Sequence, residues 1–124
     1  MDERVRQFIQ GSVQTIIGLD IVLFFQANPD TFDTPAGLAL RLRRSVAQIE
    51  PVLVRLAGHG ILEVHTRGDG QYQCYALVRS PQVWNLLCLL SEAYLDDPHT
   101  RKQIVHMLVG HQRPGQDPAP RPEQ

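Results

Sequence analysis

A β-hairpin that directly follows two short helices, all within residues 34–78, constrains the fold of this chain more than any other feature. Residues 61–66 alternate apolar and polar side chains, residues 71–77 do so again, and Arg67-Gly68-Asp69-Gly70 lies between the two runs. An Asp-Gly pair between alternating runs is the strongest short-range signal for a hairpin. The chain is therefore expected to hold a small sheet beside its helices.

The two helices before the hairpin are predicted from their caps and from the spacing of their apolar residues. The first is capped by Asp33 or Thr34 and runs to about Arg43. Ser45 caps the second helix, and residues 58–60 (Gly-His-Gly) supply its left-handed end. Between these ends, apolar residues recur one turn apart: Ile49, Leu53 and Leu56.

Pro51 conflicts with this second helix. It lies six residues inside the helix, where a proline removes one backbone donor and clashes with the preceding turn. Two outcomes are expected. Either the first turn of the helix is irregular, or Glu50 caps a shorter helix that begins at Pro51.

Further helices are expected on both sides of this segment. Residues 4–27 carry apolar side chains at helical spacing, with a plausible break near Gly11, and the helix ends at residues 28–30 (Asn-Pro-Asp). Its second half is apolar on most sides, which indicates burial, including burial against a partner chain. Ser80 and Pro81 begin another helix, which residues 97–98 (Asp-Pro) end, and a last helix runs over about residues 99–109.

These elements predict a mainly α fold with a small β-hairpin (α+β) in a single domain of 124 residues. Residues 1–30 form an N-terminal helical arm and first helix, 31–79 the helix-turn-helix and hairpin core, and 80–111 C-terminal helices for dimerisation or packing. Residues 112–124 contain four of the nine prolines and no large apolar side chain, so they are expected to form a disordered tail.

The chain is expected to be cytoplasmic. No apolar run approaches the roughly 20 residues that a membrane span needs, and the N-terminus lacks the positive charge of a signal peptide. Cys74 and Cys88 have no metal-binding spacing and are predicted to be free, partly buried thiols. The sequence predicts no catalytic set, no phosphate-binding loop, no metal site and no cofactor.

Positive charge is concentrated in the middle of the chain. The formal net charge is −1, but residues 34–79 carry six arginines against three acidic residues, and both flanking segments are net negative. A local basic patch of this kind is typical of proteins that contact phosphates.

Residues 34–78 resemble the winged helix-turn-helix of bacterial transcription regulators of the arsenic-repressor and multiple-antibiotic-resistance-repressor kind. Their pattern is L-A-x-x-L-x-x-S-x-x-x-V-x-x-x-L-x-x-L-x-x-x-G-L-[VI], followed by a wing hairpin. The residues that fall near these positions are Leu38, Leu42, Ser45, Ile49, Leu53, Leu56, Gly60, Ile61 and Leu62. A looser similarity to small, largely uncharacterised bacterial winged-helix proteins extends to both sides. The resemblance implies a homodimer that binds double-stranded DNA.

In regulators of this kind the second helix enters the major groove and the hairpin, or wing, contacts an adjacent minor groove. The resemblance implies that Gln48 reads a base edge, Arg55 meets phosphate or guanine, and Ser45 with the helix N-terminus holds a phosphate. Arg67 at the wing tip resembles the arginine that enters a minor groove. The full set of candidate DNA-binding residues is Arg41, Arg43, Arg44, Ser45, Gln48, Arg55 and Arg67.

Other readings stay open. Glu50, Pro51 and Asp69 depart from the pattern, and they favour the alternative of a winged-helix protein-protein interaction module without DNA binding. A regulator that responds to a small molecule, bound between the Trp84 helix and the core, is a third hypothesis. Trp84 itself, together with Leu87 and Leu90, is predicted to belong to the core or to a dimer interface.

Overall fold

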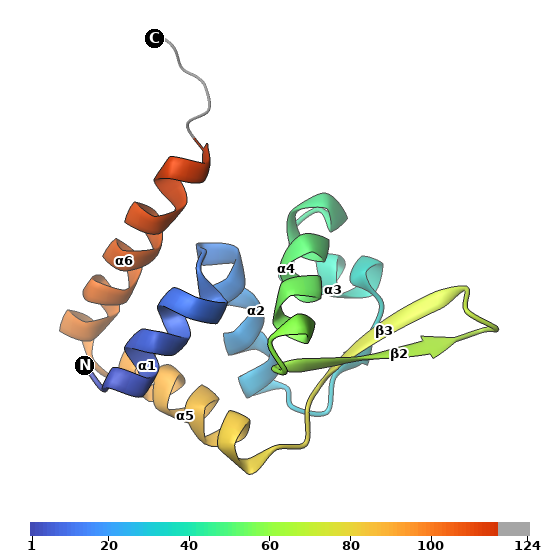
Figure 1. The fold of residues 1–124 in the computed structure, drawn as a ribbon, viewed down its shortest axis with the longest axis horizontal. Helices are drawn as coiled ribbons and strands as arrows, with labels where there is room; N and C mark the ends of the chain where they lie inside the picture. Colours follow the sequence, from blue (N-terminus) through green and yellow to red (C-terminus); the bar gives the residue numbers. More distant parts are fainter. Residues whose placement is uncertain (117–124) are drawn as a thin grey trace, which may run out of the picture.

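The computed structural model describes the backbone of residues 1–116, and it confirms the mainly α fold with a small antiparallel sheet. A helix-turn-helix is followed by a hairpin, and further helices lie on both sides of this segment in the sequence (Figure 1). The elements are α1 (Glu3–Phe8), the π-helical turn η1 (Ile9–Val13), α2 (Ile16–Ala27), β1 (Phe32–Asp33), α3 (Pro35–Leu42), α4 (Val46–Gly58), β2 (Leu62–Arg67), β3 (Tyr72–Leu77), α5 (Pro81–Asp96) and α6 (Pro98–Gln116).

The N-terminal helix breaks between η1 and α2, so the predicted break near Gly11 is displaced. Gln14 has a φ of 62°, and Thr15 Oγ1 caps α2 by accepting a hydrogen bond from the Gly18 N–H at 3.0 Å. The absence of a side chain at Gly18 lets α2 approach η1, because a Cβ there would overlap the Val13 carbonyl. The cap at Thr15, rather than the flexibility of Gly11, sets the break.

A side chain caps the N-terminus of each helix of the helix-turn-helix. Thr34 Oγ1 accepts from the Gly37 N–H at 3.1 Å, so Thr34 rather than Asp33 caps α3. Arg43 ends α3 in the left-handed conformation, with a φ of 57°. Ser45 and Gln48 then form a reciprocal capping box at the start of α4, with hydrogen bonds of 3.1 and 2.9 Å.

Pro51 lies within a continuous α4, so neither outcome expected for it is correct. The first turn is regular, since the Ile49 N–H bonds the Ser45 carbonyl at 3.2 Å. Ala47 and Pro51 are both exposed, and water can therefore bond the Ala47 carbonyl that Pro51 leaves without a helical donor. The opposite face holds the helix in place through four buried residues: Ile49, Val52, Leu53 and Leu56.

The sheet has the order β1-β3-β2 and is antiparallel throughout. The predicted hairpin is confirmed, and its pairing runs from Leu62 opposite Leu77 to Arg67 opposite Tyr72. The strands extend away from the helices (Figure 1). Sequence analysis missed β1, which pairs Phe32 with Ala76, because a two-residue strand is too short to show an alternating pattern.

Helix α6 extends to Gln116, beyond the end predicted near Val109 and into the segment predicted as a tail. Residues 117–124 of the predicted tail lie outside the described residues.

The core is made by apolar side chains from all six α-helices, from η1 and from strands β2 and β3. Leu87 and Leu90 belong to the core, as predicted. Trp84 does not belong to the core: it is 38% exposed and lies in the first turn of α5, at the rim of a cavity. Cys74 and Cys88 are free thiols, as expected. Among the described residues no single helix is long and apolar enough to cross a membrane, but the bent pair Glu3–Val13 and Ile16–Ala27 meets that test jointly by length and composition alone.

Candidate nucleic-acid interface

The residues to which the sequence assigns DNA binding divide into an exposed group and a group bound to other parts of the protein. The exposed candidates lie at the end of α3, on the outer face of α4 and at the hairpin tip. Together with four exposed neighbours that are not candidates, Glu50, Pro51, Val54 and Asp69, they form what we call the α4–hairpin surface: Arg41, Arg43, Ser45, Gln48, Glu50, Pro51, Val54, Arg67 and Asp69. It carries three arginines against two carboxylates, so its formal charge is positive but small.

The first turn of α4 is exposed and fixed in geometry. Ser45 Oγ accepts from the Gln48 N–H, while Gln48 Oε1 accepts from the Ser45 N–H. The amide Nε2 of Gln48 has no partner among the described residues, so it can still donate to an external acceptor. The backbone N–H groups at the start of the helix also favour negative charge nearby.

Arg41 and Arg67 each lie over an aromatic ring of the protein. The guanidinium carbon of Arg41 is 4.8 Å from the centre of the Phe24 ring, and that of Arg67 is 5.1 Å from the centre of the Phe32 ring. Contacts of this kind orient a guanidinium without neutralising it. Arg43 has no ion pair or hydrogen bond through its side chain in the described part of the chain. All three cations are thus available to an external anion.

The Arg44 side chain is less exposed than those of Arg41 and Arg43, and it is bonded to another element of the protein. Its Nε donates to Asp20 Oδ2 at 2.9 Å, and its Nη2 contacts the same oxygen. Only 25% of the Arg44 side chain is exposed. The ion pair joins the turn between α3 and α4 to α2, and it therefore positions α4.

Arg55 is bound to the break between η1 and α2. Its Nε donates to the Ser12 carbonyl at 3.1 Å and its Nη2 to the Val13 carbonyl at 2.8 Å. His59, the C-cap of α4, lies 2.9 Å from Ser12 Oγ through its Nδ1. Burial lowers the pKa of the Arg55 guanidinium below its ordinary value, because desolvation disfavours the charged form. Arg55 therefore fastens α4 to the N-terminal helices.

The helix-turn-helix that carries this surface also exposes apolar side chains. Leu40 on α3 is 82% exposed and Val54 on α4 is 55% exposed, and Val46 is a third exposed residue of this kind. An exposed apolar side chain alone is ordinary, but several together on one helix-turn-helix are a feature of protein-binding surfaces. This surface thus combines cationic and apolar groups.

No family model and no curated protein sequence matches the chain. A solved structure, described as a possible transcriptional regulator from Methanosarcina mazei Go1, is similar to it with a TM-score of 0.56 and 18% sequence identity. The similarity covers 82% of this chain and 85% of that one. The two proteins share a fold. At this identity the likeness extends to the arrangement of the backbone and not to individual site residues.

The structure brings the predicted candidates together only in part. Arg41, Arg43, Ser45, Gln48 and Arg67 belong to the α4–hairpin surface, whereas Arg44 and Arg55 face other elements of the protein. Sequence analysis missed Phe32, whose ring supports Arg67, and Asp20, the partner of Arg44. Nothing in the local pattern indicates either contact, since the partners are separated by 24 residues or more along the chain.

Proposed function

We propose that this chain is a DNA-binding transcriptional regulator of the winged-helix kind, with α4 as the recognition helix and β2–β3 as the wing. The observation that carries the proposal is the exposed, capped first half of α4, which lies beside Arg43 and belongs to the same helix-turn-helix-hairpin unit as Arg67. A helix presented in this way fits the major groove, and the arginines on either side of it fit the phosphate backbone. The fold shared with a possible transcriptional regulator supports the proposal.

The residues have different roles in this proposal. Arg43 contacts a phosphate, Gln48 Nε2 donates to a base edge, and the backbone at Ser45 holds a second phosphate. Arg67, oriented by Phe32, contacts the minor groove beside the wing. Arg44 and Arg55 do not contact DNA in this account but hold α4 at the required angle.

Retention of genomic DNA tests the proposed function. Purified protein is mixed with sheared genomic duplexes at about 0.1 M salt, where specific complexes persist and most non-specific ones weaken. We expect a subset of fragments to be enriched and to bind with a Kd below about 1 μM. If no duplex from the whole genome binds in that range, the proposal is wrong.

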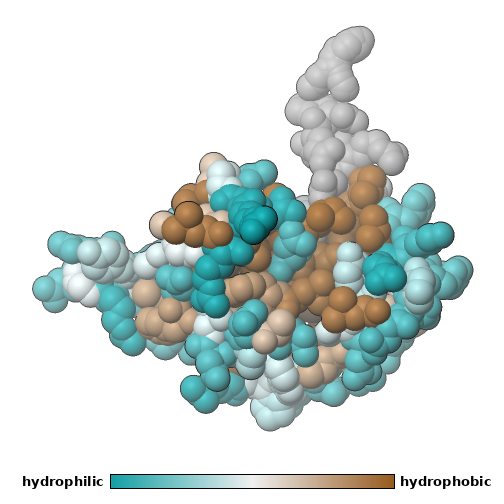
Figure 2. Space-filling view, turned by 180° about the vertical axis from the view of Figure 1, so that it is seen from behind, coloured by the Kyte–Doolittle hydropathy of each residue, from teal (hydrophilic) through white to brown (hydrophobic). Residues whose placement is uncertain are grey.

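We further infer that two copies of the chain pair through its helical half. Leu95 on α5 is 59% exposed and Val109 on α6 is 44% exposed, while Leu23 on α2 is only partly buried. Figure 2 shows apolar side chains gathered over this half of the molecule. Pairing here leaves both α4 helices free for successive half-sites, and residues 80–111 then serve the predicted role in dimerisation.

Light scattering after gel filtration measures this pairing. At about 50 μM chain, a concentration that favours association, we expect twice the 14.0 kDa mass of one chain. The double variant Leu95→Glu/Val109→Glu is expected to lower that mass towards one chain, because it places charge in the apolar contact. Leu40→Glu, on the other half of the molecule, is the matched control. A mass of one chain for the unaltered protein contradicts the inference.

A second candidate function is supported by the exposed apolar residues Leu40, Val46 and Val54. They fit a winged-helix protein-protein interaction module that uses the outer face of α4 to bind another protein. Under this alternative, nuclease-treated lysate yields a partner protein that Val54→Asp releases, and no duplex is retained. Under the proposed function the retained molecule is DNA.

A further inference from the structure

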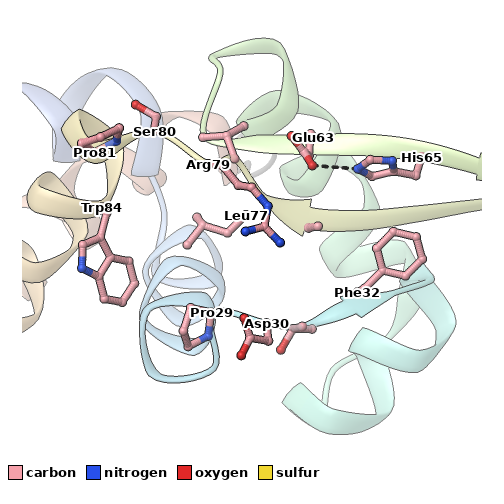
Figure 3. A pocket seen from close by; sticks show the side chains of 13 residues that line it. Pro29, Asp30, Phe32, Glu63, His65, Leu77, Arg79, Ser80, Pro81 and Trp84 are labelled. Carbon is pink, nitrogen blue, oxygen red and sulfur yellow. Dashed lines mark hydrogen bonds and ion pairs between the residues drawn. The ribbon is translucent and has the colours of Figure 1, made fainter.

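A cavity of about 690 Å³ lies at the base of the hairpin, between the α2–β1 loop, the sheet and the first turn of α5 (Figure 3). Small-molecule sites commonly measure about 300–1,000 Å³ and are lined by apolar groups with a few polar ones. Part of the lining is apolar and includes Pro29, Leu77, Pro81 and Trp84. Its size and composition therefore suit a small organic ligand.

The polar groups of the cavity favour an anionic ligand group. The guanidinium of Arg79 lies in the middle of the lining residues in Figure 3, and it has no ion pair or hydrogen bond within residues 1–110. Thr31, which also lines the cavity, is only 7% exposed, and its hydroxyl has no partner among the described residues. Such a hydroxyl is normally satisfied by a partner or by a bound molecule. Ser80 caps the sixteen-residue helix α5 at the same edge, so the positive end of its dipole faces this region.

Two carboxylates also line the cavity, and they differ in whether another side chain of the protein already contacts them. Glu63 Oε2 lies 2.7 Å from His65 Nε2, so one of its two oxygens is engaged by that contact. Asp30 makes no ion pair in the described part of the chain and opposes an anion at the rim. The ligand's negative group therefore belongs at Arg79, with its apolar body against Trp84 and Leu77.

We propose that this cavity binds a small organic carboxylate with an apolar body, whose carboxylate pairs with Arg79. A guanidinium and a carboxylate can form two parallel hydrogen bonds, which gives both affinity and orientation. Phe32 lines the same cavity, and its ring supports Arg67 of the hairpin. A bound ligand would thus contact the Phe32 ring, which orients Arg67 in the wing. This effect on the wing rests on the proposed function, whereas ligand binding itself does not rest on it.

Titration without DNA tests the proposal, so its failure is distinct from failure of DNA binding. Trp84 is the single tryptophan of the chain and lies in the cavity, so its fluorescence reports occupancy directly. The probes are 4-phenylbutyrate and octanoate, each compared with its neutral amide, with calorimetry as a second readout. We expect saturable binding of an acid with an affinity at least about tenfold higher than that of its amide, the effect of one added ion pair.

Three variants localise the effect. Arg79→Gln is expected to reduce the affinity for the acid by about tenfold, to the level of the amide. Asp30→Asn is expected to increase it, because one like charge is removed. Lys102→Gln, an exposed cation on α6 away from the cavity, is expected to change nothing. Absence of saturation up to about 10 mM, equal binding of acid and amide, or unchanged binding by Arg79→Gln would each overturn the proposal.

Discussion

Replacement of Gly18 by alanine is expected to reduce the free energy of unfolding by about 3 kcal/mol, the upper end of the usual cost of overpacking a core. Gly18 is buried in the first turn of α2, and an added Cβ would overlap the Val13 carbonyl. That carbonyl belongs to the backbone and cannot rotate away as a side chain can. It also accepts the hydrogen bond from Arg55, so any shift of Val13 also weakens the attachment of α4.

The direction of this effect is diagnostic. In an ordinary helix, alanine is about 1 kcal/mol more favourable than glycine, so substitution elsewhere should be neutral or stabilising. Gly11→Ala is the matched control, because nothing lies within 4 Å of the added Cβ at Gly11. Urea unfolding measures both variants, and the Gly18→Ala midpoint is expected to fall by more than about 1 M. A Gly18→Ala chain as stable as the unaltered one would show that α2 does not approach Val13 in this way.

The double variant Arg43→Ala/Arg67→Ala is expected to weaken binding to a retained duplex by about 10- to 100-fold at 0.1 M salt, because one phosphate contact and one minor-groove contact are lost. Both side chains are exposed, and neither caps a helix through its side chain. Folding should therefore be unchanged, which circular dichroism and urea unfolding verify.

Its control is Lys102→Ala, which removes an exposed charge from α6, on the helical half of the chain. This variant is expected to bind duplex as the unaltered chain does. Equal loss of binding in both variants would mean that net charge alone, rather than the α4–hairpin surface, is responsible. Full binding by the Arg43→Ala/Arg67→Ala chain would remove these two residues from the proposed interface.

Features encoded within a few residues were predictable from the sequence. The caps at Thr34, Ser45 and Ser80 depend on backbone groups three residues away, and the Asp-Gly turn of the hairpin is equally local. The buried stripe of α4 follows from helical spacing alone. For these reasons the order of helices and the hairpin could be predicted without knowledge of any distant contact.

Contacts between distant residues could not be predicted in this way. Arg55 appears on the polar side of a helical pattern, yet it donates to the carbonyls of Ser12 and Val13, more than 40 residues earlier. The strand at Phe32 exists only because β3 offers it a free edge.

The salt dependence of duplex binding tests the central claim most directly. The dissociation constant for the most enriched genomic fragment is measured from about 0.05 to 0.3 M salt. We predict that log Kd rises linearly with log salt with a slope of at least about 2.7, which is about 0.9 for each of Arg41, Arg43 and Arg67 when each displaces a counterion. A dissociation constant that does not change with salt, or no binding even at the lowest concentration, would contradict the assignment of the α4–hairpin surface to DNA.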